Sequence, residues 1–172
     1  MKKTRTLALI TLASLLVTGT AAGCSSEEAD VSIPFSDITW ENSLDDIIAV
    51  EGDEYESYDS VYNGTTYSFP KTFDGIEGEV KYMFDDNDEL MCIAWQCSTA
   101  DASELENVYS DIHSDLEDTY GESGYNSDSH SSNRGDVWYR EEGDIVLSAV
   151  TTSTMNALLY SYLHPDVSNQ EK

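Results

Sequence analysis

Basic residues are scarce in this chain. Its 172 residues contain eight Lys and Arg against 34 Asp and Glu, which gives a formal net charge of −26 at pH 7. From Cys24 onward only five bases remain against all 34 acids, a formal charge of −29. A surface this acidic is repelled by nucleic acids and by anionic lipid headgroups. We therefore expect no nucleic-acid partner.

Specific catalytic and metal-binding motifs are also lacking. There is no HExxH pattern, the acidic turn at residues 85–89 lacks the spacing and glycine of an EF-hand, and the histidines at positions 113, 130 and 164 have no metal-ligand neighbours. SFPK at residues 68–71 matches the SxxK pattern of penicillin-binding enzymes, but Pro70 argues against the helix on which that pattern works. RGD at residues 134–136 is either an integrin-binding tripeptide in an exposed loop or a chance occurrence. We expect no catalytic residue, no metal site and no cofactor, and hence no enzyme.

The N-terminal apolar run is too short to span a membrane. It extends from Leu7 to Val17, follows three basic residues and leads into Ala21, Ala22 and Gly23, which is the layout of an export signal. Small residues directly before Cys24 resemble the lipobox of bacterial lipoproteins. The resemblance implies that residues 1–23 are removed and that Cys24 carries diacylglycerol, with the protein held on the cell membrane and facing outside the cytoplasm. The alternative is an ordinary secreted protein cut near Ala22, with Cys24 free or bridged.

Chain composition suggests one folded domain. Residues 24–37 are acidic and nearly free of aliphatic pattern, so we expect a flexible tether there. Residues 38–165 suffice for a single domain with a modest core, and residues 166–172 are expected to be a disordered tail.

Two helices alternate with two groups of strands in the expected domain. One short amphipathic helix starts at Ser43 and stops at Gly52, and a longer one runs from Asp101 to Gly121. Alternating patterns and tight turns predict strands within residues 55–97 and after residue 136, with a mobile loop over 121–136. This order predicts an α+β fold: a single antiparallel sheet of about six strands, with two helices packed on one face.

The repeated plan of helix and strand meander, together with the lipobox, resembles two groups of small proteins. These are modules related to β-lactamase inhibitor protein and the small accessory lipoproteins of the outer-membrane assembly machine. The resemblance covers the order of elements over most of residues 38–163 and implies no functional residue.

Cys92 and Cys97 lie five positions apart in one predicted strand. Regular strand geometry puts them on opposite faces and about 16 Å apart, beyond the reach of a disulfide. Free buried thiols are the leading prediction, while a break in the strand near Ala94–Gln96 would allow a bridge.

Aromatic residues are abundant, with eleven Tyr and three Trp. Several fall in predicted strands, where the simpler interpretation is core packing. The alternative is a partner-binding sheet face of aromatics ringed by carboxylates, formed by Tyr82, Trp95, Trp138 and Tyr160. We expect a lipid-anchored, non-enzymatic binding module for a protein or envelope component. The alternatives are an envelope hydrolase with an unidentified carboxylate site and a small solute- or cation-binding lipoprotein.

Overall fold

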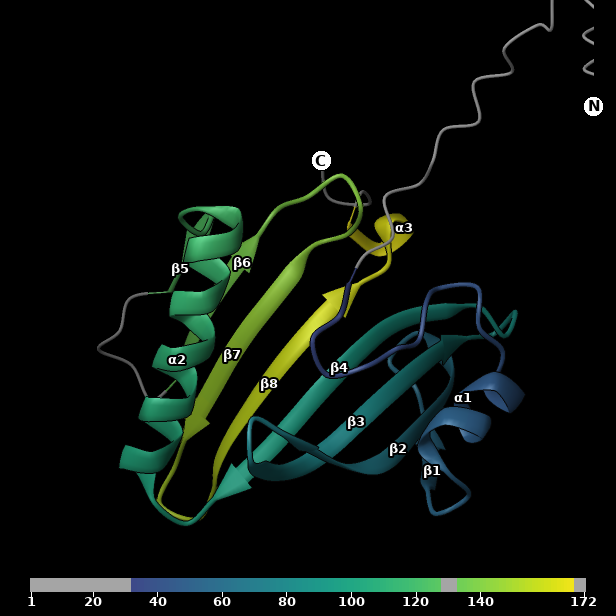
Figure 1. Cartoon of the computed structure of the whole chain (residues 1–172), viewed down its shortest axis with the longest axis horizontal. Coiled ribbons are helices and arrows are strands. Elements are labelled where there is room, and N and C mark those ends of the chain that lie inside the picture. The colour runs from purple at the N-terminus through teal and green to yellow at the C-terminus, as the bar shows by residue number, and fades with distance from the viewer. Residues whose placement is uncertain (1–31, 128–132, 169–172) are drawn as a thin grey trace, which may run out of the picture.

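The computed structural model describes residues 32–127 and 133–168, which form one antiparallel sheet and three helices (Figure 1). Along the chain the elements are α1 (Leu44–Glu51), β1 (Glu56–Asp59), β2 (Asn63–Phe73), β3 (Ile76–Asp85), β4 (Leu90–Thr99), α2 (Ala102–Tyr120), β5 (Tyr125–Asn126), β6 (Asn133–Trp138), β7 (Ile145–Thr151), β8 (Asn156–Leu163) and α3 (Pro165–Ser168). The strand order is β1-β2-β3-β4-β8-β7-β6-β5. Each half is thus a helix followed by a four-stranded meander, and the halves meet where β4 pairs with β8.

Both longer helices cover the same face of the sheet (Figure 1). Residues paired directly across antiparallel strands point to the same face. One such row runs across five strands through Tyr82, Ile93, Tyr162, Ile145 and Trp138. At one end Tyr82 donates a hydrogen bond to Glu51 of α1, and at the other end Trp138 packs against His113 of α2. This face therefore holds the core of the domain.

Capping explains where these two helices begin and end. Ser43 and Asp46 form a reciprocal capping box at the start of α1, and the Asp101 carboxylate accepts a hydrogen bond from the N–H of Ser103 at the start of α2. Gly52 and Gly121 end the two helices with φ of 102° and 81°, in the left-handed region that favours glycine. The predicted bounds of both helices are confirmed.

The predicted number of elements is wrong, since the sheet has eight strands rather than about six and there are three helices rather than two. All four residues of β1 are exposed. Its sequence therefore shows no alternation of apolar and polar residues from which a strand could be predicted. β5 is only two residues long and lies within the stretch expected to be a loop. Backbone hydrogen bonds to the neighbouring strand hold such short edge strands in the sheet, and these bonds leave no pattern in the amino-acid sequence. Pro165 begins α3, because the fixed φ of proline suits the first turn of a helix.

The folded domain extends beyond the predicted bounds at both ends. Ile33, Phe35 and Ile38 are buried in the core, and their segment runs between α2 and α1 in Figure 1. The Phe35 ring packs edge-on against Phe73, Tyr160 and Tyr162, at centroid distances of 5.8, 5.1 and 6.0 Å. The tether prediction is therefore wrong for residues 33–37. Ser168 is buried as well, so the predicted tail is wrong for its first residues. Residues 24–31 and 169–172 lie outside the described part of the chain.

Replacing Phe35 tests whether this segment belongs to the core. We expect Phe35→Ala to lower the free energy of unfolding by about 3–4 kcal/mol, because it empties a buried aromatic site. Urea denaturation followed by tryptophan fluorescence measures the change. Ser32→Ala, at an exposed position of the same segment, should change stability by less than about 0.5 kcal/mol. Equal, small effects of both substitutions would show that the segment does not pack in solution.

Candidate functional site

The aromatic side chains expected to form an exposed binding face are buried. Tyr82, Trp95, Trp138 and Tyr160 have exposed fractions of 0%, 0%, 2% and 3%. All four lie on the face that the helices cover. The indole N–H groups also bond within the domain, Trp95 to the Lys71 carbonyl at 3.1 Å and Trp138 to the Gly121 carbonyl at 2.9 Å. These residues are core residues and present no contact surface in this fold.

The two cysteines of β4 are free and buried, on opposite faces of the strand, as the leading prediction has it. Burial raises the pKa of the Cys92 thiol to about 12 and also raises the pKa of Cys97. Because the thiolate is the reactive form, both side chains are inert at neutral pH. Cys24, predicted to carry the lipid, lies outside the described residues together with the signal sequence 1–23.

Three short motifs noted in the sequence form strands or a strand-connecting turn. Asp136 of the RGD tripeptide is 0% exposed inside β6, so the interpretation as an exposed integrin-binding loop is wrong. Residues 68–71 are extended within β2 and do not form a helical SxxK arrangement. In the acidic turn, the Asp85 carboxylate accepts hydrogen bonds from the N–H groups of Glu89 and Asn87, each at 2.9 Å, and these bonds lower the pKa of Asp85. His130 lies outside the described residues.

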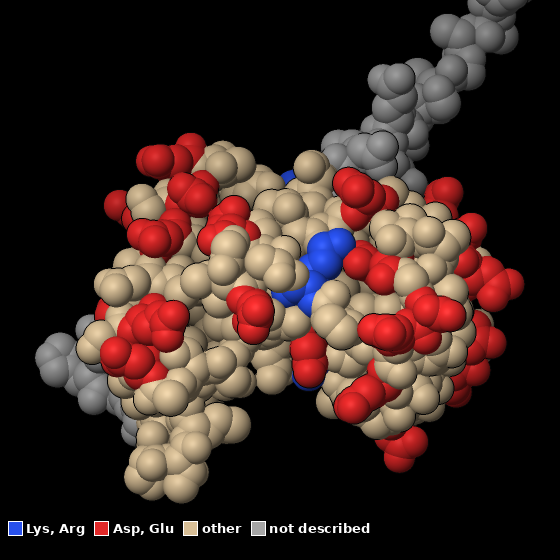
Figure 2. Space-filling view, turned by 60° about the horizontal axis from the view of Figure 1, so that its bottom comes forward, with Lys and Arg blue, Asp and Glu red and all other residues tan. Residues whose placement is uncertain are grey.

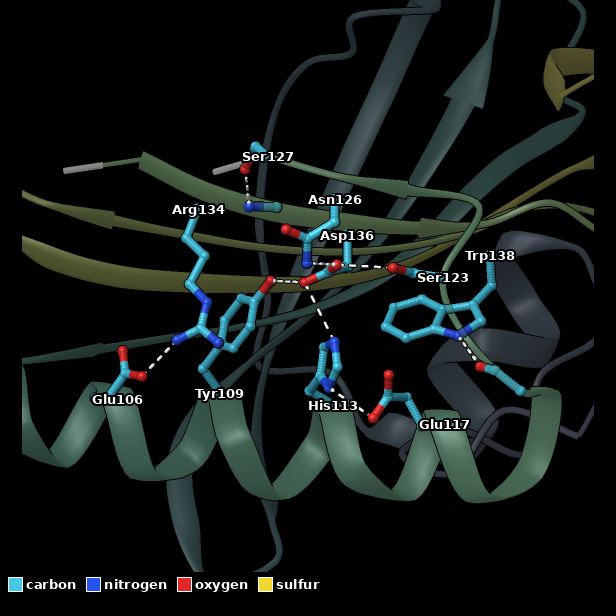
Figure 3. A network of polar contacts seen from close by, with 12 residues as sticks. Glu106, Tyr109, His113, Glu117, Ser123, Asn126, Ser127, Arg134, Asp136 and Trp138 are labelled. Atoms are coloured by element: carbon cyan, nitrogen blue, oxygen red, sulfur yellow. Dashed lines mark hydrogen bonds and ion pairs between the residues drawn. The ribbon is translucent and has the colours of Figure 1, made fainter. Parts of the chain in front are cut away.

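Asp136 is the centre of a polar cluster between α2 and the sheet (Figure 3). Its carboxylate accepts hydrogen bonds from the Tyr109 hydroxyl, the Asn126 amide and the Ser123 hydroxyl, the last at 2.9 Å. His113 Nε2 lies 3.5 Å from the same carboxylate. One oxygen of Asp136 faces Ser123 and Asn126, and the other faces Tyr109 and His113. Both oxygens are thus occupied by protein donors.

Because both oxygens of Asp136 are engaged by other residues of the domain, the cluster ties α2 to β6. We call this cluster of Asp136, Tyr109, His113, Ser123 and Asn126 the clamp. Tyr109 and His113 lie four residues apart on one side of the helix, and both point from α2 toward Asp136 of β6 (Figure 3). Burial and the hydrogen bond to Asp136 raise the pKa of Tyr109, so its hydroxyl stays protonated and keeps donating. A proton-transfer site needs an oxygen free for substrate, and Asp136 has none to offer.

The opposite face of the sheet is covered by neither α1 nor α2, and its second half carries no charge. Strand pairing places fourteen residues on this face of β4, β8, β7 and β6: Cys92, Ala94, Gln96, Ser98, Ala157, Leu159, Ser161, Leu163, Val146, Ser148, Val150, Asn133, Gly135 and Val137. We call this set the uncharged face. On neighbouring β3 the same side of the sheet carries Glu77, Glu79 and Lys81.

Such a lack of charge is unusual in this protein. Of the 34 acids and eight bases in the chain, 29 acids and four bases lie within the described residues. Figure 2 shows acidic side chains spread over the surface visible there, with basic ones confined to the hollow between two lobes. On the uncharged face the Val and Leu side chains are all partly exposed, and Tyr125 of β5, paired with Val137, is 54% exposed at its edge.

A signal for the uncharged face was present in the sequence. Residues 145–163 contain no charged residue, in a chain where 24% of residues are charged. β7 and β8, which lie in this run, therefore carry no charged side chain on either face of the sheet. Periodicity alone does not reveal which side the helices cover, so the signal could not be assigned to a surface.

Comparisons with protein-family models, with curated proteins and with solved structures found no match. In residues 32–127 and 133–168, no group of three or more His, Cys, Asp or Glu side chains is placed to hold a metal ion. The helices of this described part include none that is long and apolar enough to cross a membrane. The family resemblances noted above stay predictions.

The clamp at Asp136 makes a testable contribution to stability. We expect Asp136→Asn to lower the free energy of unfolding by about 3 kcal/mol, because an amide N–H would face the donors that the carboxylate now satisfies. Tyr109→Phe should cost about 1–3 kcal/mol, and the double variant less than the sum, since the residues share one bond. Denaturant titration measures all three, with exposed Asp111→Asn on α2 as the neutral control. Strict additivity would show that the two residues do not interact.

Proposed function

We propose that this protein is a lipid-anchored, non-enzymatic module outside the cytoplasmic membrane that binds another protein through its uncharged face. The observation that carries the proposal is the contrast in charge across the domain. A surface of partly exposed Val and Leu beside an exposed tyrosine, within an otherwise acidic protein, has the composition of a protein interface centre with a polar surround.

The negative charge of the domain narrows the classes of molecule that could bind to the uncharged face. Anionic lipids and nucleic acids are repelled by the acids around the face. A second copy of this chain would bring an equally acidic surround, and like charges disfavour self-association. A different protein, with an apolar contact patch, fits the face best.

The lipobox supports the anchor in this proposal. A lipid on Cys24 would hold on the membrane a chain that its charge drives away from anionic headgroups. The polar clusters beneath α1 and α2 support the non-enzymatic part, because Glu51 and Asp136 are engaged by side chains of the domain itself.

Substitution of Cys24 tests the anchor. Cys24→Ala should move the protein from the membrane fraction to the soluble fraction and abolish incorporation of labelled palmitate, because each buried methylene contributes about 0.8 kcal/mol to membrane affinity. Ser25→Ala, one position on, should leave fractionation and labelling unchanged. Membrane attachment and labelling that persist in Cys24→Ala would refute the lipid anchor.

A cross-linked pull-down from native membranes tests the binding face. We expect a reproducible protein partner, and we expect Val146→Lys to abolish its recovery because a lysine there would be desolvated on binding. Thr72→Lys, an exposed site on β2 outside the uncharged face, is the matched control and should retain the partner. Recovery of no reproducible protein, or equal recovery with both variants, would contradict the proposal.

A further inference from the structure

A groove lies on the helix-covered side of the sheet, away from the uncharged face. Its volume is about 580 Å³. One wall is the C-terminal half of α2, the other is formed by residues 32–34 and the turn between β2 and β3, and the floor is β8. The lining residues are Ser32, Pro34, Phe73, Asp74, Ile112, Asp115, Leu116, Asp118, Thr119, Tyr120, Tyr160 and Tyr162. We call it the α2 groove.

Three carboxylates and no base line this groove. Asp74 lies on one wall, and Asp115 and Asp118 lie on the other. Within the described residues, no side-chain hydrogen bond or ion pair engages these three carboxylates. Three of the four described bases pair outside the groove: Lys71 with Glu51, Lys81 with Glu79 and Gln96, and Arg134 with Glu106. Arg140 pairs with Glu142, and its guanidinium lies over the ring of the lining residue Tyr120, 4.4 Å from the ring centroid. Because Arg140 is already paired with Glu142, none of the described bases pairs with the three carboxylates of the lining.

The position of two of these acids on α2 is unfavourable for the free protein. The C-terminal end of a helix carries partial negative charge, where basic residues stabilise and acidic ones destabilise. α2 has no basic residue in its last turn, while Asp118 lies in that turn and Asp115 just before it. Burial raises the pKa of Tyr160, the nearby Asp115 adds to the rise, and Arg140 opposes it. A cation bound in the groove would relieve this repulsion.

Exposed aromatic surface in the groove suits the aliphatic part of a long basic side chain. Phe73 is partly exposed and Tyr120 is 37% exposed, whereas Leu116, Tyr160 and Tyr162 are buried. Lys and Arg bury their methylene stems on such surfaces while the charged head reaches outward to polar groups, and an ammonium or guanidinium group also interacts favourably with aromatic rings.

We infer that the α2 groove binds Lys or Arg side chains of a partner protein segment. A protein segment is also held by contacts on either side of the groove, which a free small molecule lacks. The preceding stretch of this chain is excluded as occupant by charge, because residues 24–31 contain three acids and no base. The inference is independent of the uncharged face and of the lipid anchor.

The probe for the test is acetylated, amidated hexalysine, titrated into the full protein as purified from its native membrane fraction or medium, in neutral detergent at physiological salt. Asp115→Asn combined with Asp118→Asn should weaken binding about tenfold, because both lost charges face the groove. Asp111→Asn combined with Glu122→Gln removes the same charge from exposed positions outside the groove and should weaken binding less than about twofold. This control separates the groove from general attraction to an acidic protein.

Thermal melting shows that the loss of binding is not a loss of folding. Removing two acids from the C-terminal part of α2 should leave the melting temperature unchanged or raise it by about 1–3 °C. Equal weakening by both double variants, or no weakening by either, would overturn the inference. Spermidine that binds as tightly as hexalysine, with the same dependence on Asp115 and Asp118, would overturn the assignment to a protein segment in favour of a free polyamine.

Discussion

The pairing of β4 with β8 is the contact on which the rest of the domain depends. Eight residue pairs, from Cys92 with Leu163 to Thr99 with Asn156, join two halves that each consist of a helix and a meander. Side chains of β8 alternate between the two surfaces described above: Tyr160 and Tyr162 form the floor of the α2 groove, while Leu159 and Leu163 belong to the uncharged face. A disturbance at this seam would therefore alter both surfaces together.

Each longer helix is fixed to the sheet by a buried tyrosine and carboxylate, with the positions exchanged between halves. In the first half the carboxylate is on the helix, where Glu51 accepts from Tyr82 of β3 at 2.6 Å and pairs with Lys71. In the second half the tyrosine is on the helix, and Tyr109 donates to Asp136 of β6. A buried carboxylate is tolerated only when it is fully hydrogen-bonded. These two acids stabilise packing, whereas most others in the chain are exposed and add to repulsion.

Local chemistry made part of this structure predictable. The caps at Ser43 and Asp101 located both longer helices, and strand period placed Cys92 and Cys97 on opposite faces. The edge strands β1 and β5 could not be predicted because backbone pairing, not side-chain pattern, holds them. The choice of exposed face could not be predicted either. β4 is apolar on both sides, so alternation sorted its residues into two sets without indicating that the helices cover the set containing Trp95. The Asp136 clamp joins residues 27 positions apart, a separation that carries no local pattern.

The early start of the folded domain limits how far the protein could reach from a membrane. Fully extended, the chain from Cys24 to Ser32 spans at most about 28 Å, which is less than the diameter of about 37 Å of a compact domain of this size. With a lipid on Cys24, Ser32 and Pro34 would stay close to the bilayer, and they line the α2 groove. The groove would then meet mainly proteins embedded in or lying on the same membrane, at a local concentration well above that of the surrounding fluid. The position of Ser32 in the chain, eight residues after Cys24, thus sets the volume that the domain can search.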